Sequence, residues 1–358
     1  IDLDQLAESS ETLVRFLDNV VTWNEDLNAL PKQRQAASET RRLGLGVMGI
    51  ADMLNQLGVA YDSEQGTMMI EKVMEYITNA SYQASSFIAK EKGASSIFDE
   101  EAYMECPFVK EALSEQTHNM IRKNGLRNIA IMSIAPTGSI SNIVLGYKSE
   151  EKNYIGVSGG VEPIFSTFYT RRSESFGNKM FKVFHSTIQA YIDKMGIQED
   201  IDKAEDVDEV LPEFLTRTAH KIDSVKRVGV QGVIQRYIDH SISSTINLPE
   251  DVEPETISDI YIKAWKNKLK GVTIYRDGSR FPILSVENKM TEFQEMKNKS
   301  FSIMQENGET IDMAGDDIFK RPDGKLTTMY HHLKKMKTES EDDSTTTETV
   351  ATTEEVKV

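Results

Sequence analysis

The stretch Asn128–Ser141, with the sequence NIAIMSIAPTGSIS, decides the fold because two different patterns meet in it. Residues 128–134 form a short apolar run that lacks helical spacing, which is typical of a buried strand. The run ends abruptly at Pro136, which fixes its own φ angle, and Gly138, which adds conformational freedom. The stretch therefore predicts a buried strand that leads into a tight loop.

This loop is also a candidate anion site. Thr137, Ser139 and Ser141 supply hydroxyl donors, and a glycine-containing turn after a strand can aim several backbone N–H groups at one phosphate. If a helix begins near Ser139, its first N–H groups would reinforce the site. An ordinary strand-to-helix turn with a serine cap has the same residue pattern, so both interpretations stay open at this point.

Helical patterns lie on both sides of the strand. Apolar residues recur at spacings of three and four over residues 1–30, 42–57, 62–92, 225–242 and 254–269. Asp62 and Gln65 are placed as the N-cap and N3 residues of a capping box that opens the third of these helices. Val272–Tyr275 is a second buried-strand candidate. Helices that alternate with buried strands predict an α/β fold.

The segment RRLGLGVMGI, residues 41–50, contains the spacing G-x-G-x-x-G. A dinucleotide-binding turn needs a strand directly before its first glycine, but residues 31–42 are polar and do not alternate. The glycines instead fall within the helix predicted for residues 42–57. We therefore expect them to serve close helix packing, and an NAD-dependent dehydrogenase is disfavoured.

The composition restricts the class of protein. The 358-residue chain has 57 acidic and 41 basic residues and a formal net charge of −16, which disfavours a nonspecific DNA-binding surface. It contains no apolar run near the ~18 residues of a membrane span, and its acidic first residues do not resemble a signal peptide. The sequence predicts a cytoplasmic protein without membrane or DNA partners. Because it begins with Ile1 and not Met, we expect a fragment or a processed product.

Metal and disulfide chemistry are not indicated. Cys106 is the single cysteine, which excludes an internal disulfide and a cysteine-based zinc site. The adjacent pair His331 and His332 lacks the spacing of a helical metal motif. We expect no metal site in this chain.

Five segments together resemble the second half of a ribonucleotide reductase catalytic subunit. They occur in family order and cover roughly residues 10–285: RRLGLGVMGIADML (41–54), IAPTGSIS (134–141), SGGVEPIF (158–165), STINLPEDV (244–252) and KGVTIYRDGSR (270–280). The last two are most similar to the adenosylcobalamin-dependent class II. The iron-dependent class I shares the phosphate-loop pattern but differs in its C-terminal part.

The resemblance implies an α/β fold, namely the C-terminal part of a ten-stranded barrel built from two parallel five-stranded halves. It also implies that one loop holds the substrate phosphates through backbone N–H groups and hydroxyls, at Ala135, Pro136, Thr137, Gly138, Ser139 and Ile140. Residues 1–285 would belong to the barrel and residues 286–337 would form a C-terminal extension. The Thr/Glu-rich residues 338–358 are expected to be a disordered tail.

The chain also departs from the family in ways that bear on catalysis. In the family, a thiyl radical forms on the cysteine of an N-x-C-x-E segment, and cysteine pairs supply electrons. The residues around Cys106 match neither the Asn nor the Glu of that segment. We therefore expect a split reductase without catalytic residues in this chain. A companion N-terminal polypeptide would bring the N-x-C-x-E segment, and the assembled enzyme would use adenosylcobalamin, an external thiol reductant and a ribonucleotide substrate. A class I segment and a non-catalytic nucleotide- or protein-binding remnant are the alternatives.

Overall fold

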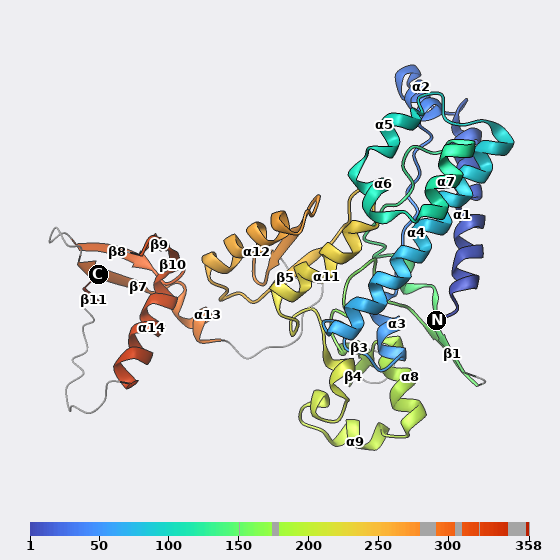
Figure 1. The fold of residues 1–358 in the computed structure, drawn as a ribbon. Helices are drawn as coiled ribbons and strands as arrows, with labels where there is room; N and C mark the ends of the chain where they lie inside the picture. Colours follow the sequence, from blue (N-terminus) through green and yellow to red (C-terminus); the bar gives the residue numbers. More distant parts are fainter. Residues whose placement is uncertain are drawn as a thin grey trace. The chain divides into compact units, whose positions relative to one another are not determined.

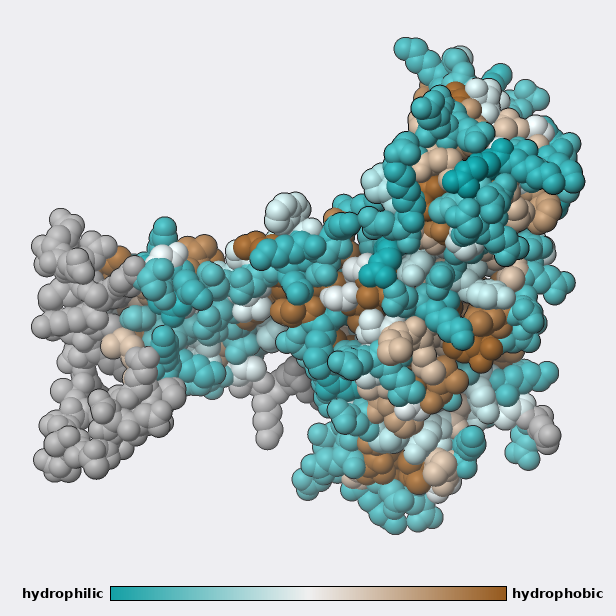
Figure 2. All heavy atoms as spheres, viewed as in Figure 1, coloured by the Kyte–Doolittle hydropathy of each residue, from teal (hydrophilic) through white to brown (hydrophobic). Residues whose placement is uncertain are grey.

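The computed structural model describes residues 1–149, 151–173, 179–279, 291–304, 310–321, 323–342 and 356–357 (Figure 1). The chain divides into two compact units. The first comprises Ile1–Ile246 with Lys263–Thr273, and the second comprises the described parts of Asn247–Ile262 and Ile274–Val358. The surface drawn in Figure 2 is mostly hydrophilic, with apolar residues in scattered patches. None of the described helices is long and apolar enough to cross a membrane.

The first unit is mainly helical. Its helices and 3₁₀ turns are α1 (Leu3–Asn24), α2 (Pro31–Thr40), α3 (Ile50–Gln56), α4 (Glu64–Lys92), α5 (Glu100–Met104), α6 (Pro107–Ala112), α7 (Glu115–Asn124), η1 (Ile140–Asn142), α8 (Ser186–Met195), α9 (Gln198–Lys203), η3 (Val207–Glu209), α10 (Glu213–Thr216) and α11 (Ser224–Arg236). Two antiparallel hairpins pair β1 (Leu145–Lys148) with β2 (Asn153–Ile155), and β3 (Phe168–Ser173) with β4 (Lys179–Phe184).

Helix α4 forms the centre of the first unit. It packs against α1, α7 and α11, and its buried side chains join one large apolar cluster (Figure 1). Ser63 is the N-cap, since its hydroxyl accepts the N–H of Gly66 at 3.0 Å, and Gly93 ends the helix with a φ of 88°. The predicted cap at Asp62 is therefore wrong by one residue. Asp62 instead accepts a hydrogen bond from Arg217 Nε at 2.9 Å, a contact that the local sequence pattern does not show.

Three extended segments, residues 43–46, 130–134 and 241–244, form a parallel arrangement that we call the strand array. Leu45 bridges Met132, and Ile134 bridges Ile242, both in parallel register. Ser133 N–H donates to Leu45 O at 2.8 Å, and Ser243 N–H donates to Ile134 O at the same distance. The buried strand predicted at residues 128–134 thus lies in the middle of this array.

The helix predicted for residues 42–57 is wrong over its first half. Residues 43–46 are extended and α3 begins only at Ile50. Leu43 and Leu45 are buried whereas Gly44 and Gly46 are exposed, an alternation that the helical spacing of Leu43, Val47 and Ile50 disguised. A Cβ on Gly46 would lie 2.3 Å from Ser133 O, so the glycine permits close approach of two strands and not of two helices.

Elements of the second unit follow the array along the chain. β5 (Thr245–Leu248), α12 (Pro254–Lys266) and β6 (Thr273–Arg276) contribute residues to both units, and β5 pairs with β6. The remaining elements are α13 (Glu292–Met296), β7 (Ser300–Met304), β8 (Thr310–Ala314), β9 (Ile318–Lys320), β10 (Leu326–Thr328), α14 (Met329–Asp342) and β11 (Val356–Lys357). β7 pairs with β8 and β11, and β9 pairs with β10.

The predicted barrel domain (residues 1–285), extension (286–337) and tail (338–358) remain predictions. The second unit begins well before residue 285, and that residue lies outside the described residues. Residues 338–342, predicted to begin a disordered tail, continue α14, and residues 356–357 form β11. The rest of the predicted tail, residues 343–355 and 358, lies outside the described residues.

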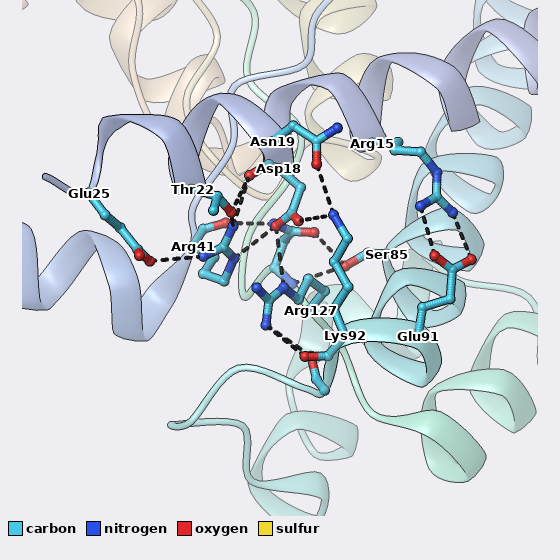
Figure 3. A network of polar contacts seen from close by, with 12 residues as sticks. Arg15, Asp18, Asn19, Thr22, Glu25, Arg41, Ser85, Glu91, Lys92 and Arg127 are labelled. Atoms are coloured by element: carbon cyan, nitrogen blue, oxygen red, sulfur yellow. Dashed lines mark hydrogen bonds and ion pairs between the residues drawn. The ribbon is translucent and has the colours of Figure 1, made fainter. Parts of the chain in front are cut away.

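A buried ion pair joins α1 to the beginning of the strand array (Figure 3). Asp18 and Arg41 are almost completely buried, and Arg41 Nε donates to Asp18 Oδ1 at 2.8 Å. Arg41 Nη2 donates to Asp18 O at 2.8 Å and to Thr22 Oγ1 at 2.6 Å. Asn128, at the start of the central strand, donates to Asp18 Oδ1 at 3.0 Å and to Arg41 O at 2.9 Å. One carboxylate therefore positions α1 and two strands together.

Replacing Asp18 with Ala is expected to lower the free energy of unfolding by about 3–5 kcal/mol, because Arg41 would stay buried with only the more distant, partly exposed Glu25 as a counter-charge. Urea denaturation of the full chain, followed by circular dichroism, measures this change. Glu91→Gln is the matched control, since it removes the exposed Arg15–Glu91 pair between α1 and α4 and should change stability little. Equal losses in the two variants would contradict a special role for the buried pair.

The contribution of Asp18 should depend on pH. Burial alone would raise the pKa of this carboxyl group, but the hydrogen bond and the positive charge of Arg41 outweigh burial and hold the pKa below its ordinary value. The stabilisation is thus complete above the unfolded-state pKa of about 4 and is lost as pH falls through the lower folded-state pKa. We expect the stability difference between the wild-type chain and Asp18→Asn to shrink below about pH 4. Urea titrations between pH 2 and 7 measure it, and a pH-independent difference would refute the assignment.

Candidate functional site

The predicted anion loop follows the central strand of the array. Residues 135–140 are largely exposed, and the chain turns sharply because Thr137, not Gly138, has a positive φ of 52°. Ser141 N–H donates to Thr137 O at 2.9 Å, and Asn142 Nδ2 donates to Gly138 O at 2.6 Å. The short turn η1 begins at Ile140. The expectation that Gly138 supplies the unusual backbone conformation is therefore wrong, although the tight loop itself is present.

The loop exposes a row of unpaired donors. The N–H groups of residues 137–140 donate no hydrogen bond to any part of the chain that the structure describes. The Ser139 hydroxyl is exposed on the same loop. Successive unpaired N–H groups at a tight turn form a concave surface of positive potential that suits an anion. The six residues predicted to bind phosphate thus lie together, and four of them present free backbone donors.

A second loop, residues 158–162, packs against the anion loop and supports it. Gly160 N–H donates to Thr137 Oγ1 at 2.8 Å, and Thr137 is the strained residue of the anion loop. A Cβ on Gly159 would lie 2.6 Å from Pro136 O, and one on Gly160 would lie 2.9 Å from Ala135 O. Both glycines are required because the two backbones touch. This supporting loop therefore determines where the anion loop lies.

Two carboxylates, the buried Asp52 and the partly exposed Glu162, anchor the supporting loop. Asp52 on α3 accepts the N–H of Ser158 at 2.7 Å and the hydroxyl of Thr187 at 2.5 Å. Gly49, the N-cap of α3, donates its N–H to Ser158 O at 2.9 Å. The third glycine of the G-x-G-x-x-G segment thus serves the supporting loop and not a dinucleotide.

At the other end of the loop, Glu162 accepts hydrogen bonds from Arg227 Nη2 at 2.6 Å and from Thr245 N–H at 2.8 Å. Arg227 is buried on α11, also donates to Ser244 Oγ at 2.6 Å, and lies over the ring of Tyr61. Burial raises the pKa of the Tyr61 hydroxyl to about 12, so this tyrosine stays neutral. Arg227 and Glu162 tie the supporting loop to the third strand of the array.

The strand array has one apolar face and one polar face. Leu43, Leu45 and Ile242 are buried in the apolar cluster. The residues that alternate with them are small or polar and at least partly exposed: Gly44, Gly46, Ser133, Ser241 and Ser243. The anion loop begins where the central strand of this array ends. A polar surface beside the unpaired N–H groups of residues 137–140 can accommodate the sugar and phosphates of a nucleotide.

The other sequence candidates lie elsewhere. Cys106 is exposed as the N-cap of α6, and its thiol makes no capping hydrogen bond to the helix. His331 lies in α14 and its Nδ1 is 2.6 Å from Thr328 Oγ1. No group of three potential metal ligands occurs among the described residues.

The sequence matches the family "Ribonucleotide reductase, barrel domain" over residues 1–275. The vitamin B12-dependent ribonucleoside-diphosphate reductase of Mycobacterium tuberculosis is 30% identical over 294 residues, which cover 78% of this chain and 37% of that protein. The corresponding reductase of Thermoplasma acidophilum is 32% identical over 295 residues, which cover 78% of this chain and 34% of that protein.

A solved structure has the same fold. The class Id ribonucleotide reductase alpha subunit of Actinobacillus ureae aligns with a TM-score of 0.56 at 22% identity, covering 76% of this chain and 46% of that chain. The chain therefore belongs to the ribonucleotide reductase family and is part of its barrel domain. It spans about a third of the length of the two reductases above. The predicted family and fold class are confirmed.

Sequence reasoning missed the residues that support the anion loop. Asp52, Glu162 and Arg227 come from three separate elements, and no local pattern marks them as a group. The segment SGGVEPIF was identified as part of the family resemblance but not as a support for the anion loop, although its two adjacent glycines before Glu162 were the available signal. Adjacent glycines outside a helix indicate close backbone contact, which is what the structure places there.

Gly159→Ala should displace the anion loop, because its methyl group would lie against Pro136 O and the backbone would have to move. We expect a loss of about 1–3 kcal/mol in unfolding free energy and shifted amide resonances for residues 135–141. Gly138→Ala is the control, since a Cβ there meets open space and Gly138 has no positive φ. Nuclear magnetic resonance and urea denaturation compare the two variants, and equal perturbation would argue against the supporting role of the 158–162 loop.

Proposed function

We propose that this chain is the C-terminal segment of a split ribonucleotide reductase, in which it supplies the substrate-phosphate loop and several barrel strands. The observation that carries the proposal is the row of free backbone donors at residues 137–140, located at the end of a parallel barrel strand. Its role would be to hold the phosphates of a ribonucleotide while the ribose lies over the polar face of the strand array. The names of the two B12-dependent relatives favour a diphosphate substrate.

A companion polypeptide would carry the radical chemistry. The single cysteine, Cys106, is exposed, and the residues around it do not match the N-x-C-x-E segment. The chain corresponds to about a third of its relatives, so the N-x-C-x-E segment and the other barrel half would come from an N-terminal reductase polypeptide. An external thiol reductant would restore the companion's cysteines after each turnover. The absence of a described membrane-spanning helix is compatible with a cytoplasmic enzyme.

The open edge of the strand array supports this assembly. The N–H groups of Gly44 and Gly46 donate to no acceptor among the described residues, and both glycines are exposed. An unpaired strand edge is a template for a further strand. A strand from the companion would pair along residues 43–46 and continue the barrel.

Adenosylcobalamin is proposed as the cofactor of the assembled enzyme because the relatives above are named vitamin B12-dependent. A corrin ring needs a broad apolar floor, whereas the open face of the strand array carries small and polar residues such as Gly44, Ser133 and Ser243. This face fits a ribose and phosphates and does not fit a corrin. We therefore place cofactor binding on the companion and derive no step through it in this chain.

Reconstitution tests the proposed function. The purified chain alone should not reduce CDP, and it should form dCDP when the companion, adenosylcobalamin and dithiothreitol are added. Chromatography of the nucleotides measures the product. A companion whose radical cysteine is replaced by alanine is the control and should leave only background.

The alternatives give different results. Activity that requires a diiron or dimanganese radical subunit in place of adenosylcobalamin would assign the chain to class I. Binding of CDP without turnover under either condition would indicate a non-catalytic remnant. Neither outcome would affect the family assignment, which rests on the barrel-domain match.

A further inference from the structure

Helices α3, α8 and α10 and strand β1 surround a cavity of about 190 Å³, which we call the α3–α8 cavity. Helix α8 packs against both α3 and β1 (Figure 1). The lining side chains are aromatic, apolar and polar, and all of them lie in the first unit. None belongs to the anion loop or to the supporting loop. The cavity is therefore separate from the site described above.

Asn55 of α3 is the lining residue that most needs a partner. It is only 8% exposed, yet its side-chain amide forms no hydrogen bond with any residue that the structure describes. Asp52, one turn earlier, shows the usual arrangement, because both of its carboxylate oxygens accept hydrogen bonds. Burying an amide without a partner is costly. Since an amide both donates and accepts, Asn55 suits a ligand that carries a donor beside an acceptor.

Two tyrosine rings line the cavity. The ring of Tyr147 lies beside that of Tyr154, with centroids 5.8 Å apart, and the ring of Tyr191 lies beside that of Phe214 at 6.1 Å. Leu215 adds buried apolar surface to the lining. The hydroxyls of Tyr147 and Tyr191 form no hydrogen bond within the described part of the chain. Aromatic side chains that neighbouring rings already hold suit a flat ring system, because stacking then costs little conformational entropy.

Lys194 is the one charged residue among the described residues of the lining. It is exposed, and its ammonium group forms no ion pair with another described residue. Ala190, one turn earlier on α8, is buried, so the cation lies toward solvent from the apolar part of the lining. An unpaired cation beside uncharged side chains favours a ligand whose ring carries an anionic group on the solvent side.

These features together match a nucleotide. Adenine presents its N6–H donor next to its N7 acceptor, and an asparagine amide pairs with both. Sites for larger ligands usually measure about 300–1,000 Å³, whereas this cavity of about 190 Å³ accommodates a base and leaves the ribose and phosphate outside. The phosphate would then lie near Lys194.

We propose that the α3–α8 cavity is a nucleobase site that binds the adenine ring of AMP against Tyr147 and Tyr191. Asn55 forms hydrogen bonds with the edge of the base, and Lys194 faces the 5′-phosphate. The proposal does not depend on the split reductase, because no residue of the cavity belongs to the anion loop.

Calorimetry with adenosine tests the site, because adenosine has no phosphate to occupy the anion loop. The full chain should bind adenosine, and Asn55→Leu, which keeps the size of the side chain, should weaken binding at least tenfold. Tyr147→Ala should do the same, since it removes a stacking surface from a partly exposed strand position. Tyr261→Ala is the matched control: this tyrosine is exposed on α12 and does not line the cavity, so affinity should stay within about twofold. Circular dichroism verifies that each variant is folded.

Photolabelling locates the bound ligand. Irradiation with 2-azidoadenosine should label peptides that contain Tyr147 or Tyr191, and excess adenosine should suppress the labelling. AMP should suppress it at a lower concentration than adenosine does, because its phosphate adds an attraction to Lys194. This advantage of AMP should disappear in Lys194→Gln.

The other outcomes overturn the proposal. Displacement of adenosine by inorganic pyrophosphate would place the ligand at the anion loop. Equal affinity of the wild-type chain and Asn55→Leu would remove the amide from the site. No binding at millimolar adenosine would leave the cavity to water alone. The split reductase would stand after each of these results, because reconstitution tests it separately.

Discussion

The buried Asp18–Arg41 pair is the interaction on which the first unit depends. It brings together α1, the edge strand that begins after Arg41, and the central strand that begins after Asn128. Such a pair adds little net stability over apolar packing, but removing one partner is costly. Its main effect is therefore on geometry. By fixing Asn128 at the start of the central strand, the pair also fixes the direction of that strand, which ends at residue 134, directly before the anion loop.

The anion loop is held by its neighbours more than by its own sequence. Its one strained residue, Thr137, bonds to Gly160, and the loop that contains Gly160 is anchored by Asp52 at one end and Glu162 at the other. This arrangement leaves the N–H groups of residues 137–140 free. A preorganised row of donors binds an anion without the entropic cost of ordering the loop, which suits a site that must hold a substrate in a defined position.

Local sequence patterns predicted most of the helices and the central strand. α1, α4, α11 and α12 lie where apolar spacing placed them, and β6 matches the strand predicted at residues 272–275 within one residue. The error at residues 42–57 has a physical cause: the helical spacing of Leu43 and Val47 and the β alternation of Leu43 and Leu45 are both present in so short a segment. Pairing with residues 130–133 decided between them, and only Gly46 allows that approach.

The sequence by itself determined the family, the position of the anion loop and the polar and apolar character of each helix, because these depend on local order and composition. The tertiary structure alone decided which carboxylates are buried, which residue bears the strained φ, and which face of α1 stays open. Leu13 and Val20 lie within the apolar pattern that predicted a helix over residues 1–30, yet both are exposed. An apolar pattern indicates that a face will be covered, but only the assembled fold shows whether this chain covers it.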